Sequence, residues 1–189
     1  FLGGGKTSQI VTLSALGLML AFLLIQIAPY RMNRLNVFLN PGLDPKGIGY
    51  HANQASIAIG SGGFWGVGLG KSLQKYNYLP EPMGDSVFAV FAEEMGFLGV
   101  LAVLAMFAAF FWQGIKIAKK APDSFGQLLA GGITLSIITQ VFINISAISG
   151  IFPLTGIPLP FFSYGGTSLA ITLAEVGILL NISKYSSVS

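Results

Sequence analysis

The chain has 189 residues, of which 53% are hydrophobic and only 9% are charged. Soluble domains carry about 25% charged residues, so this composition excludes an ordinary soluble globular protein. The absence of cysteine excludes disulfides and thiolate metal sites, and a single histidine excludes a multi-histidine metal site. A net charge of +3 without a basic run gives no sign of a nucleic-acid partner. The composition therefore indicates an integral membrane protein.

Four apolar segments are long enough to cross a bilayer, which takes about 20 residues in a helix. The second of them has no charge from Met95 to Ile115, and the stretch from Ser124 to Ala174 has none. We expect an all-α membrane domain over residues 1–189, with a long structured outer loop at 30–85. Its helices are predicted at about 8–28, 86–113, 125–151 and 167–182.

The distribution of lysine predicts the orientation of these crossings. Lys116, Lys119 and Lys120 lie in the expected short connection between the second and third helices, which is cytoplasmic by the positive-inside rule. The 30–85 loop then faces outside. Its own basic residues oppose this orientation, but the rule is weaker for long loops. They are Arg31, Arg34, Lys46, Lys71 and Lys75.

Two outer connections are expected to be structured. Ala52–Ile59 is small and apolar and predicts a short helix, which Gly60–Gly63 would end. The last connection, Gly150–Gly166, is apolar but contains three prolines and cannot be a regular helix. Because non-helical backbone at membrane depth must lie against protein or a wet cavity, this connection is expected to pack at the outer end of the molecule.

Three carboxylates at the start of the second helix need an explanation, because burying ionised carboxylates in an apolar environment is costly. Asp85 follows a proline-broken loop and can cap the helix, act as a base, or bind a metal. Glu93 and Glu94 follow within the apolar helix itself. Glu81, between two prolines, is either aimed at a ligand or a solvated loop carboxylate, and both interpretations stay open.

Three motifs in a fixed order resemble the SEDS family, the FtsW, RodA and SpoVE-type proteins of bacterial cell-wall synthesis. They are GLGKSLQK at 68–75, LPEPMGDSVFAVFAEEMGFLG at 79–99 and PLTGIPLPFFSYGGTSL at 153–169. The resemblance covers nearly the whole chain and implies the C-terminal half of a fold of roughly ten helices. Gly84 and Ser86 depart from it, since the family often has threonine and an aromatic residue there.

The resemblance implies a peptidoglycan glycosyltransferase that polymerises lipid II at the outer face of the bacterial cytoplasmic membrane. It also implies a class B penicillin-binding protein as partner, with membrane lipids around the chain. Division, elongation and sporulation are all open, and we favour division. Asp85 stands at the position of the family's catalytic residue, where it would take the proton of an acceptor hydroxyl as general base.

The departing pyrophosphate of such a reaction requires positive charge. Lys75 is the preferred candidate, because it lies near Asp85 in sequence and within the first motif, and Lys71 is a second candidate. The alternative interpretation of both lysines is that they contact lipid phosphate at the membrane interface. The chain has no Asp-x-Asp pattern or other strong metal motif, so the need for a divalent cation stays open.

The other polar residues have both structural and functional interpretations. We favour a structural role for Glu93 and Glu94, whose charges need partners on neighbouring elements. Thr155 and Ser163 are candidate substrate contacts, although the serine can equally cap the backbone. The remaining residues are interpreted as architecture: Gly165 and Gly166 as a tight entry into the fourth helix, and Ser136, Gln140 and Asn144 as hydrogen-bonding groups between helices.

A non-enzymatic membrane protein is the alternative, either a transporter of lipid-linked precursors or a divisome scaffold. A transporter would need a continuous polar path, whereas a polymerase needs only an outer site around Asp85. The path would be lined by Glu93, Glu94, Glu175, Gln140 and Asn144.

The predicted orientation can be tested with single cysteines, because the chain has none of its own. In intact cells whose outer membrane, if any, is permeabilised, an impermeant thiol reagent should label Asn77→Cys and leave Lys119→Cys unlabelled. Labelling at 119 and not at 77 would reverse the topology.

Overall fold

The computed structural model describes residues 7–27, 29–40, 47–77, 79 and 82–186, and every regular element in these ranges is a helix. Four of the helices are long and apolar enough to cross a membrane: α1, α5, α6 and α7. The prediction of an all-α protein with about four membrane-spanning helices is confirmed. The elements are α1 (Thr7–Ile27), α2 (Pro29–Leu39), α3 (Ile48–Ser61), α4 (Gln74–Asn77), α5 (Val87–Lys120), α6 (Ser124–Ile148) and α7 (Gly166–Ser186).

The helices differ from the predicted segments mainly at their ends. α5 continues to Lys120 instead of ending near 113, so the three lysines lie in its last turns and the connection is only 121–123. Basic side chains are favourable at a helix C-terminus, which is why charge did not mark the boundary. α6 ends at Ile148 rather than 151, and α7 extends to Ser186 rather than 182.

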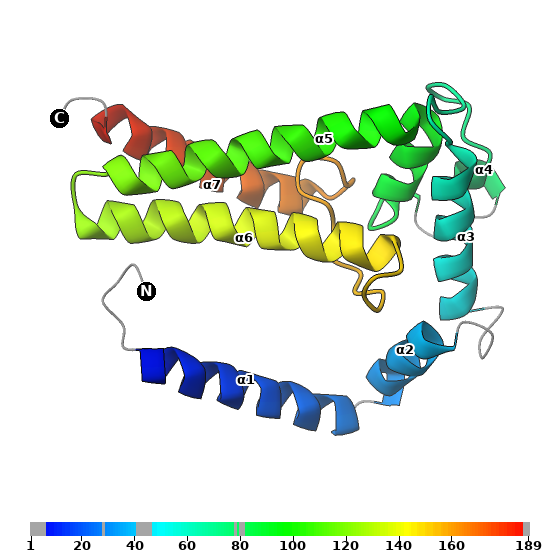
Figure 1. Cartoon of the computed structure of the whole chain (residues 1–189), viewed down its shortest axis with the longest axis horizontal. Coiled ribbons are helices and arrows are strands. Elements are labelled where there is room, and N and C mark those ends of the chain that lie inside the picture. The colour runs from blue at the N-terminus through cyan, green and yellow to red at the C-terminus, as the bar shows by residue number, and fades with distance from the viewer. Residues whose placement is uncertain (1–6, 28, 41–46, 78, 80–81, 187–189) are drawn as a thin grey trace.

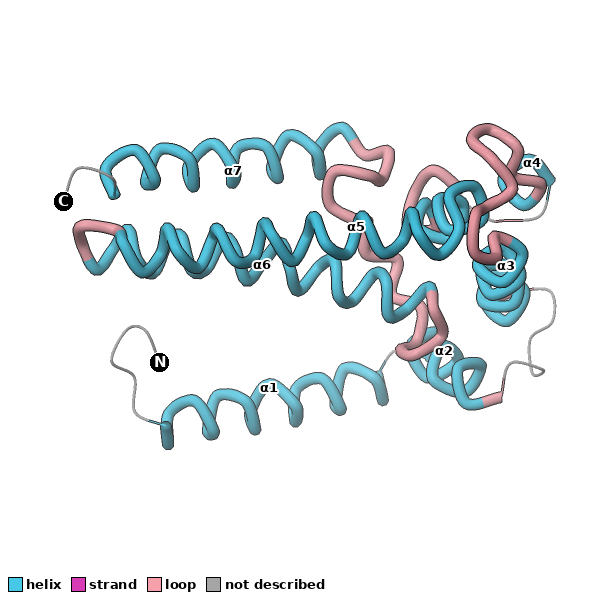
Figure 2. The backbone as a smooth tube through the Cα atoms, turned by 45° about the horizontal axis from the view of Figure 1, so that its top comes forward, coloured by secondary structure: helices cyan, strands magenta, loops and turns pink. Residues whose placement is uncertain are grey.

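Three of the spanning helices, α5, α6 and α7, lie side by side, and the short helices gather at one end of the molecule. Figures 1 and 2 show α5, α6 and α7 together and α1 apart from them. The start of α1, the end of α7 and the α5–α6 connection lie at the same end of the molecule, and α2, α3 and α4 lie at the other (Figure 1). The described residues between 29 and 85 therefore form short helices and turns gathered at the end opposite the α5–α6 connection.

Antiparallel packing of α5 on α6 forms the largest contact between helices. Asp123 caps α6, because its side chain accepts a hydrogen bond from the backbone N–H of Gly126 at 3.2 Å. Farther along, Gly114 lies against the side chain of Thr134 so closely that a methyl group there would collide with it. Small residues at this contact let the two backbones approach, as is usual between membrane helices.

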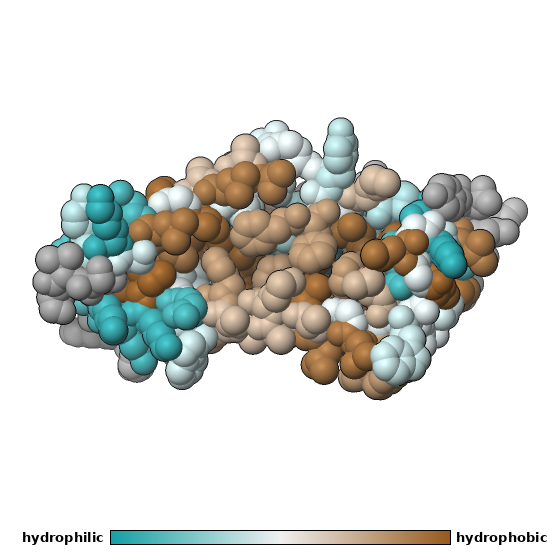
Figure 3. Space-filling model, turned by 90° about the horizontal axis from the view of Figure 1, so that it is seen from above, coloured by the Kyte–Doolittle hydropathy of each residue, from teal (hydrophilic) through white to brown (hydrophobic). Residues whose placement is uncertain are grey.

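The surface between the two ends is apolar. Space-filling Figure 3 shows a band of hydrophobic residues with more hydrophilic groups toward both ends. Large apolar side chains on α1, α5 and α7 are exposed, among them Leu18, Trp112 and Leu180. Since lipid solvates such side chains and water does not, this surface belongs in a bilayer, and the protein is a membrane protein.

The N-terminal part of α5 is separated from the rest by a break at Gly96. Gly96 has φ 64° and ψ −166°, far from helical values, so Val87–Met95 and Phe97–Lys120 are two helices that meet at an angle. The sequence analysis expected one helix over about 86–113 and did not predict this break. Glycine alone adopts such a conformation readily.

The hydrogen bonds lost at the break are replaced by the loop after α3. The backbone N–H groups of Phe97 and Leu98 donate to the carbonyl oxygens of Gly63 and Phe64, at 2.9 and 3.4 Å. In return, the N–H groups of loop residues 67 and 68 donate to the carbonyl oxygens of residues 93 and 94, at 3.0 Å each. Two N–H groups and two carbonyl oxygens next to the break are therefore paired with the loop, as backbone groups away from water require.

Gly96→Ala in the full-length protein should lower the free energy of unfolding by about 1–3 kcal/mol. A methyl group at this position would collide with the backbone of Gly66, and the positive φ disfavours any L side chain. Thermal unfolding in detergent measures the loss. Gly132→Ala is the control, because that glycine lies on the exposed side of α6 with open space around it. Equal melting temperatures for the two variants would contradict the prediction.

Candidate functional site

Asp85 lies at the corner where the outer layer enters α5. The N-cap of α5 is Ser86, whose carbonyl oxygen accepts the first helical hydrogen bond from Ala89 at 2.9 Å. Asp85 thus precedes the cap, and the capping alternative considered from the sequence is wrong. Its side chain is half-buried and its Oδ1 accepts from the Ser86 hydroxyl at 3.5 Å.

A buried amide from α6 holds this corner in place. Asn144 is only 2% exposed, and its Nδ2 donates to the carbonyl oxygens of Asp85 at 2.9 Å and Ile157 at 2.7 Å. One side chain thus joins α6, the Asp85 corner and the connection between α6 and α7. The sequence predicted hydrogen bonding for Asn144 between helices, whereas its partners are two carbonyl oxygens outside helices.

The connection between α6 and α7 passes directly beside the Asp85 carboxylate. A Cβ placed on Gly156 would lie 3.6 Å from Oδ2 of Asp85, and Gly156 has φ 71°. Just before it, the carbonyl oxygen of Leu154 accepts a hydrogen bond from Nη1 of Arg34 at 2.7 Å. Gly156, which has no side chain, therefore lies beside the Asp85 carboxylate. Arg34 holds the backbone just before it, at Leu154.

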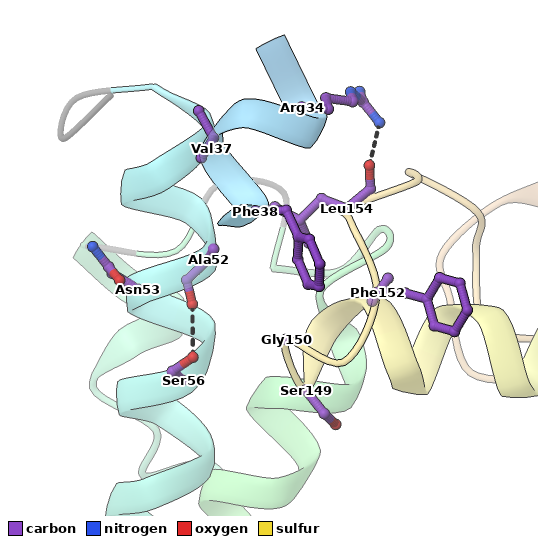
Figure 4. A pocket seen from close by; sticks show the side chains of 11 residues that line it. Arg34, Val37, Phe38, Ala52, Asn53, Ser56, Ser149, Gly150, Phe152 and Leu154 are labelled. Carbon is purple, nitrogen blue, oxygen red and sulfur yellow. Dashed lines mark hydrogen bonds between the residues drawn. The ribbon is translucent and has the colours of Figure 1, made fainter. Parts of the chain in front are cut away.

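Figure 4 shows a cavity on the outer side of this connection. Arg34 reaches from α2 toward Leu154, while Asn53 and Ser56 stand on α3 across the opening. The cavity has a volume of about 270 Å³. It is bounded by α2, α3, the end of α6 and the first residues of the connection between α6 and α7.

His51 reaches the same corner from α3. Its Nε2 lies 2.5 Å from the hydroxyl of Ser86, which is fully buried. His51 shares a face of α3 with Ala55 and Ala58, which are fully buried in the cluster that contains Phe88 of α5. The packing of α3 on α5 therefore directs the single histidine of the chain toward the residue next to Asp85.

Glu93 and Glu94 have separate partners on the segment before Asp85. The Glu93 carboxylate is 2% exposed and accepts hydrogen bonds from the Ser72 hydroxyl and from the backbone N–H of Leu73, the latter at 3.1 Å. Glu94 forms an ion pair with Lys75, with 2.6 Å between Nζ and Oε1. Both carboxylates thus tie the 68–75 segment to the short helix Val87–Met95.

A cavity of about 510 Å³ adjoins this ion pair. Its walls come from the residues before α5 and from the start of α7, which are joined by a hydrogen bond from the N–H of Tyr164 to the carbonyl oxygen of Met83 at 2.7 Å. The walls are mainly apolar. Predicted site residues among them are Lys75, Glu94, Ser163, Gly165 and Gly166.

The remaining predicted residues have less defined surroundings. Lys71 and Thr155 are exposed, and Glu81 lies outside the described residues. The Ser163 hydroxyl accepts a hydrogen bond from the N–H of Leu159 at 2.7 Å, so it braces its own loop. Gly165 provides the first helical carbonyl of α7, which accepts from Leu169 at 2.9 Å.

The structure divides the predicted residues between two places. Lys75, Glu94 and Ser163 come together at the larger cavity, and Asp85 lies at the corner with His51 and Asn144, neither of which the sequence analysis assigned to it. Only a three-dimensional contact joins His51 to Ser86, 35 residues later, so no local pattern revealed it. In the described part of the chain, no cluster of three or more metal-ligating side chains fits a metal ion.

The whole of this architecture matches one protein family. The sequence matches the cell cycle protein family of FtsW, RodA and SpoVE over residues 1–188. The chain belongs to this family. The prediction made from the three motifs is confirmed.

Curated members of the family are closely similar in sequence. The stage V sporulation protein E of Bacillus subtilis (strain 168) is 47% identical over 186 residues, which are 98% of this chain and 51% of that protein. A probable peptidoglycan glycosyltransferase FtsW of Geobacter sp. (strain M18) is 42% identical over 183 residues, 97% of this chain and 50% of that protein. The chain spans about half the length of the curated relatives it matches.

The fold also matches a solved structure. A chain from a peptidoglycan synthase complex, described as coordinating polymerisation and crosslinking, superimposes with a TM-score of 0.70 at 28% identity. The match covers 95% of this chain and 49% of the solved one. The helices described above are therefore a portion of the SEDS fold.

Asn144→Leu in the full-length protein should lower the thermal unfolding temperature, because it leaves the carbonyl oxygens of Asp85 and Ile157 without their donor. A buried group left unpaired costs about 1–3 kcal/mol. Ser136→Ala, on the exposed side of the same helix, is the control. An Asn144→Leu protein that melts with the control would show that the amide does not hold the corner.

Proposed function

We propose that this chain is part of a peptidoglycan glycosyltransferase that polymerises lipid II, with Asp85 as general base. The acceptor hydroxyl attacks the anomeric carbon of a second lipid-linked sugar. Its proton passes to Asp85 while the bond to the polyprenyl pyrophosphate breaks. A hydroxyl is a weak nucleophile near neutral pH, and a positioned base accelerates such a step by about 10²–10⁴-fold.

The observation that carries the proposal is the fixed position of Asp85 at the outer corner. Its backbone is held by the buried amide of Asn144, and its carboxylate lies beside Gly156, which has no side chain to cover it. Catalytic groups need this kind of support from surrounding residues. The similarity to probable peptidoglycan glycosyltransferases of the FtsW type supports the reaction class.

The leaving pyrophosphate requires positive charge, and we assign it to Lys75, with Lys71 as an exposed second cation. Lys75 borders the larger cavity and is paired with Glu94. The pair fixes the ammonium group on the cavity wall, where the apolar lining accommodates part of a polyprenyl chain. We derive no step through a metal ion, because the described residues offer no metal-ligating cluster.

Membership of the family supports the proposed place of the reaction and the proposed partner. Asp85 would face the outer side of the bacterial cytoplasmic membrane, where lipid-linked precursor is used, in division or elongation. The partner is a class B penicillin-binding protein, which would crosslink the strands. The similarity to a chain from a peptidoglycan synthase complex that coordinates polymerisation and crosslinking supports this partnership.

The transporter alternative needs a polar path past Glu93, Glu94 and Asn144. Glu93 and Glu94 are instead engaged with Ser72, Leu73 and Lys75 on one side of the short helix, and Asn144 is bonded to two backbone carbonyls. These groups tie segments together. The arrangement therefore favours the polymerase.

Asp85→Asn in the full-length protein should reduce polymerisation of purified lipid II by about 10²–10⁴-fold, since the amide keeps the shape but accepts no proton. Gel analysis of the glycan strands measures it. Asp123→Asn is a matched control, because asparagine caps a helix as well as aspartate does and Asp123 lies at the opposite end of the molecule.

A near-wild-type yield of polymer from the Asp85→Asn protein would refute the role of Asp85 as general base. If Glu93→Gln also blocked precursor movement in vesicles, the transporter would replace the polymerase.

A further inference from the structure

We propose that His51, acting through Ser86, receives the proton that Asp85 removes from the acceptor hydroxyl. The proposal rests on the function proposed above and adds two residues to it. The three side chains form a line in which Nε2 of His51 lies 2.5 Å from Oγ of Ser86, and Oγ lies 3.5 Å from Oδ1 of Asp85. Catalytic hydrogen bonds are often long before substrate binds, so the longer contact is compatible with transfer.

Each member of the line is fixed independently of the others. Ser86 is fully buried, the carbonyl oxygen with which it caps α5 accepts a hydrogen bond from Ala89 at 2.9 Å, and its hydroxyl contacts His51 and Asp85. The Asp85 backbone is held by Asn144. His51 is held by α3, whose face packs against α5 through Ala55 and Ala58. This placement on three separate supports distinguishes the line from a chance contact between surface side chains.

The proton balance is simple. With its own proton on Nδ1, the neutral imidazole has a lone pair on Nε2 that can accept the single proton of the Ser86 hydroxyl. While Asp85 is ionised, this hydroxyl donates to Oδ1 of Asp85. Once Asp85 carries the substrate's proton, its O–H donates to Ser86 Oγ while the Ser86 proton moves to Nε2. The carboxylate and the hydroxyl are restored, the imidazole becomes an imidazolium, and no oxidation or reduction occurs. His51 is half-buried, so its ring can return the proton to water.

The direction of transfer follows from ordinary basicity, since imidazole is a stronger base than a carboxylate. Three described ionisable side chains on the elements packed against α3 have partners elsewhere. Arg34 of α2 donates to Leu154, and Glu93 and Glu94 at the near end of α5 bind Ser72 and Lys75. α6 has no ionisable side chain between Ser124 and Ile148, and Tyr50 is the sequence neighbour of His51 on α3 itself.

The test measures the pH dependence of lipid II polymerisation by the full-length protein and by His51→Gln and Ser86→Ala. In the wild type, the maximal rate should fall on the acid side of the pH profile, because imidazolium cannot accept a proton. Both variants should lose about 10–100-fold in maximal rate with little change in KM, and this acid limb should disappear. Ser56→Ala, an exposed serine on α3, is the control and should behave as the wild type.

The two proposals fail in different ways. An inactive Asp85→Asn with a wild-type rate and pH profile for His51→Gln would refute the relay and retain the base. An active Asp85→Asn would refute the proposed function itself. If His51→Gln lost activity only in proportion to a lower thermal unfolding temperature, with its acid limb unchanged, the histidine would be structural and the relay would be wrong.

Discussion

The outer end of the molecule depends on the exchange of backbone hydrogen bonds at the break in α5. A helix that crosses a bilayer cannot leave N–H and C=O groups unpaired, and the break at Gly96 interrupts the helical pattern. The loop after α3 supplies partners for four backbone groups beside the break, from Gly63 and Phe64 on one side and from residues 67 and 68 on the other. The short helix before the break can therefore turn away from the membrane span.

That turn determines where every functional side chain lies. The short helix follows Asp85 and its cap Ser86 and carries Glu93 and Glu94 near its far end, so its orientation places Asp85 at one end and the other two carboxylates at the other. Ser72 and Lys75 bind those carboxylates. The 68–75 segment is thereby fixed against the helix, and with it the wall of the larger cavity. Asn144 and Arg34 hold the connection between α6 and α7 through its backbone carbonyl oxygens at Ile157 and Leu154.

The sequence predicted the parts of this structure that local patterns encode. The apolar runs located the four membrane-spanning helices, because each of these helices is a continuous hydrophobic stretch. The helix inside the outer loop was expected over Ala52–Ile59 and is found as α3, extended by residues at both ends. The motifs identified the family. Composition alone did not mark the end of α5, since lysines are accepted in a last helical turn.

What the sequence did not reveal are features made by contacts between distant segments. Gly96 looked like one more small residue on a helix face, and its break depends on a loop some 30 positions earlier. His51 and Asn144 are 34 positions before and 59 positions after Asp85, and only the packing of α3 and α6 brings them to it. The assignment of Asp85, Lys75, Lys71, Thr155 and Ser163 to catalysis and substrate binding stays a prediction.

The most direct test of the account is a structure of the full-length protein, determined by cryo-electron microscopy, with a lipid-linked disaccharide bound. The account predicts density for the acceptor sugar at the outer corner, with its reacting hydroxyl about 2.6–3.2 Å from the Asp85 carboxylate or one water away. A sugar bound elsewhere, with Asp85 facing no hydroxyl and the α5 helix continuous through Gly96, would contradict it.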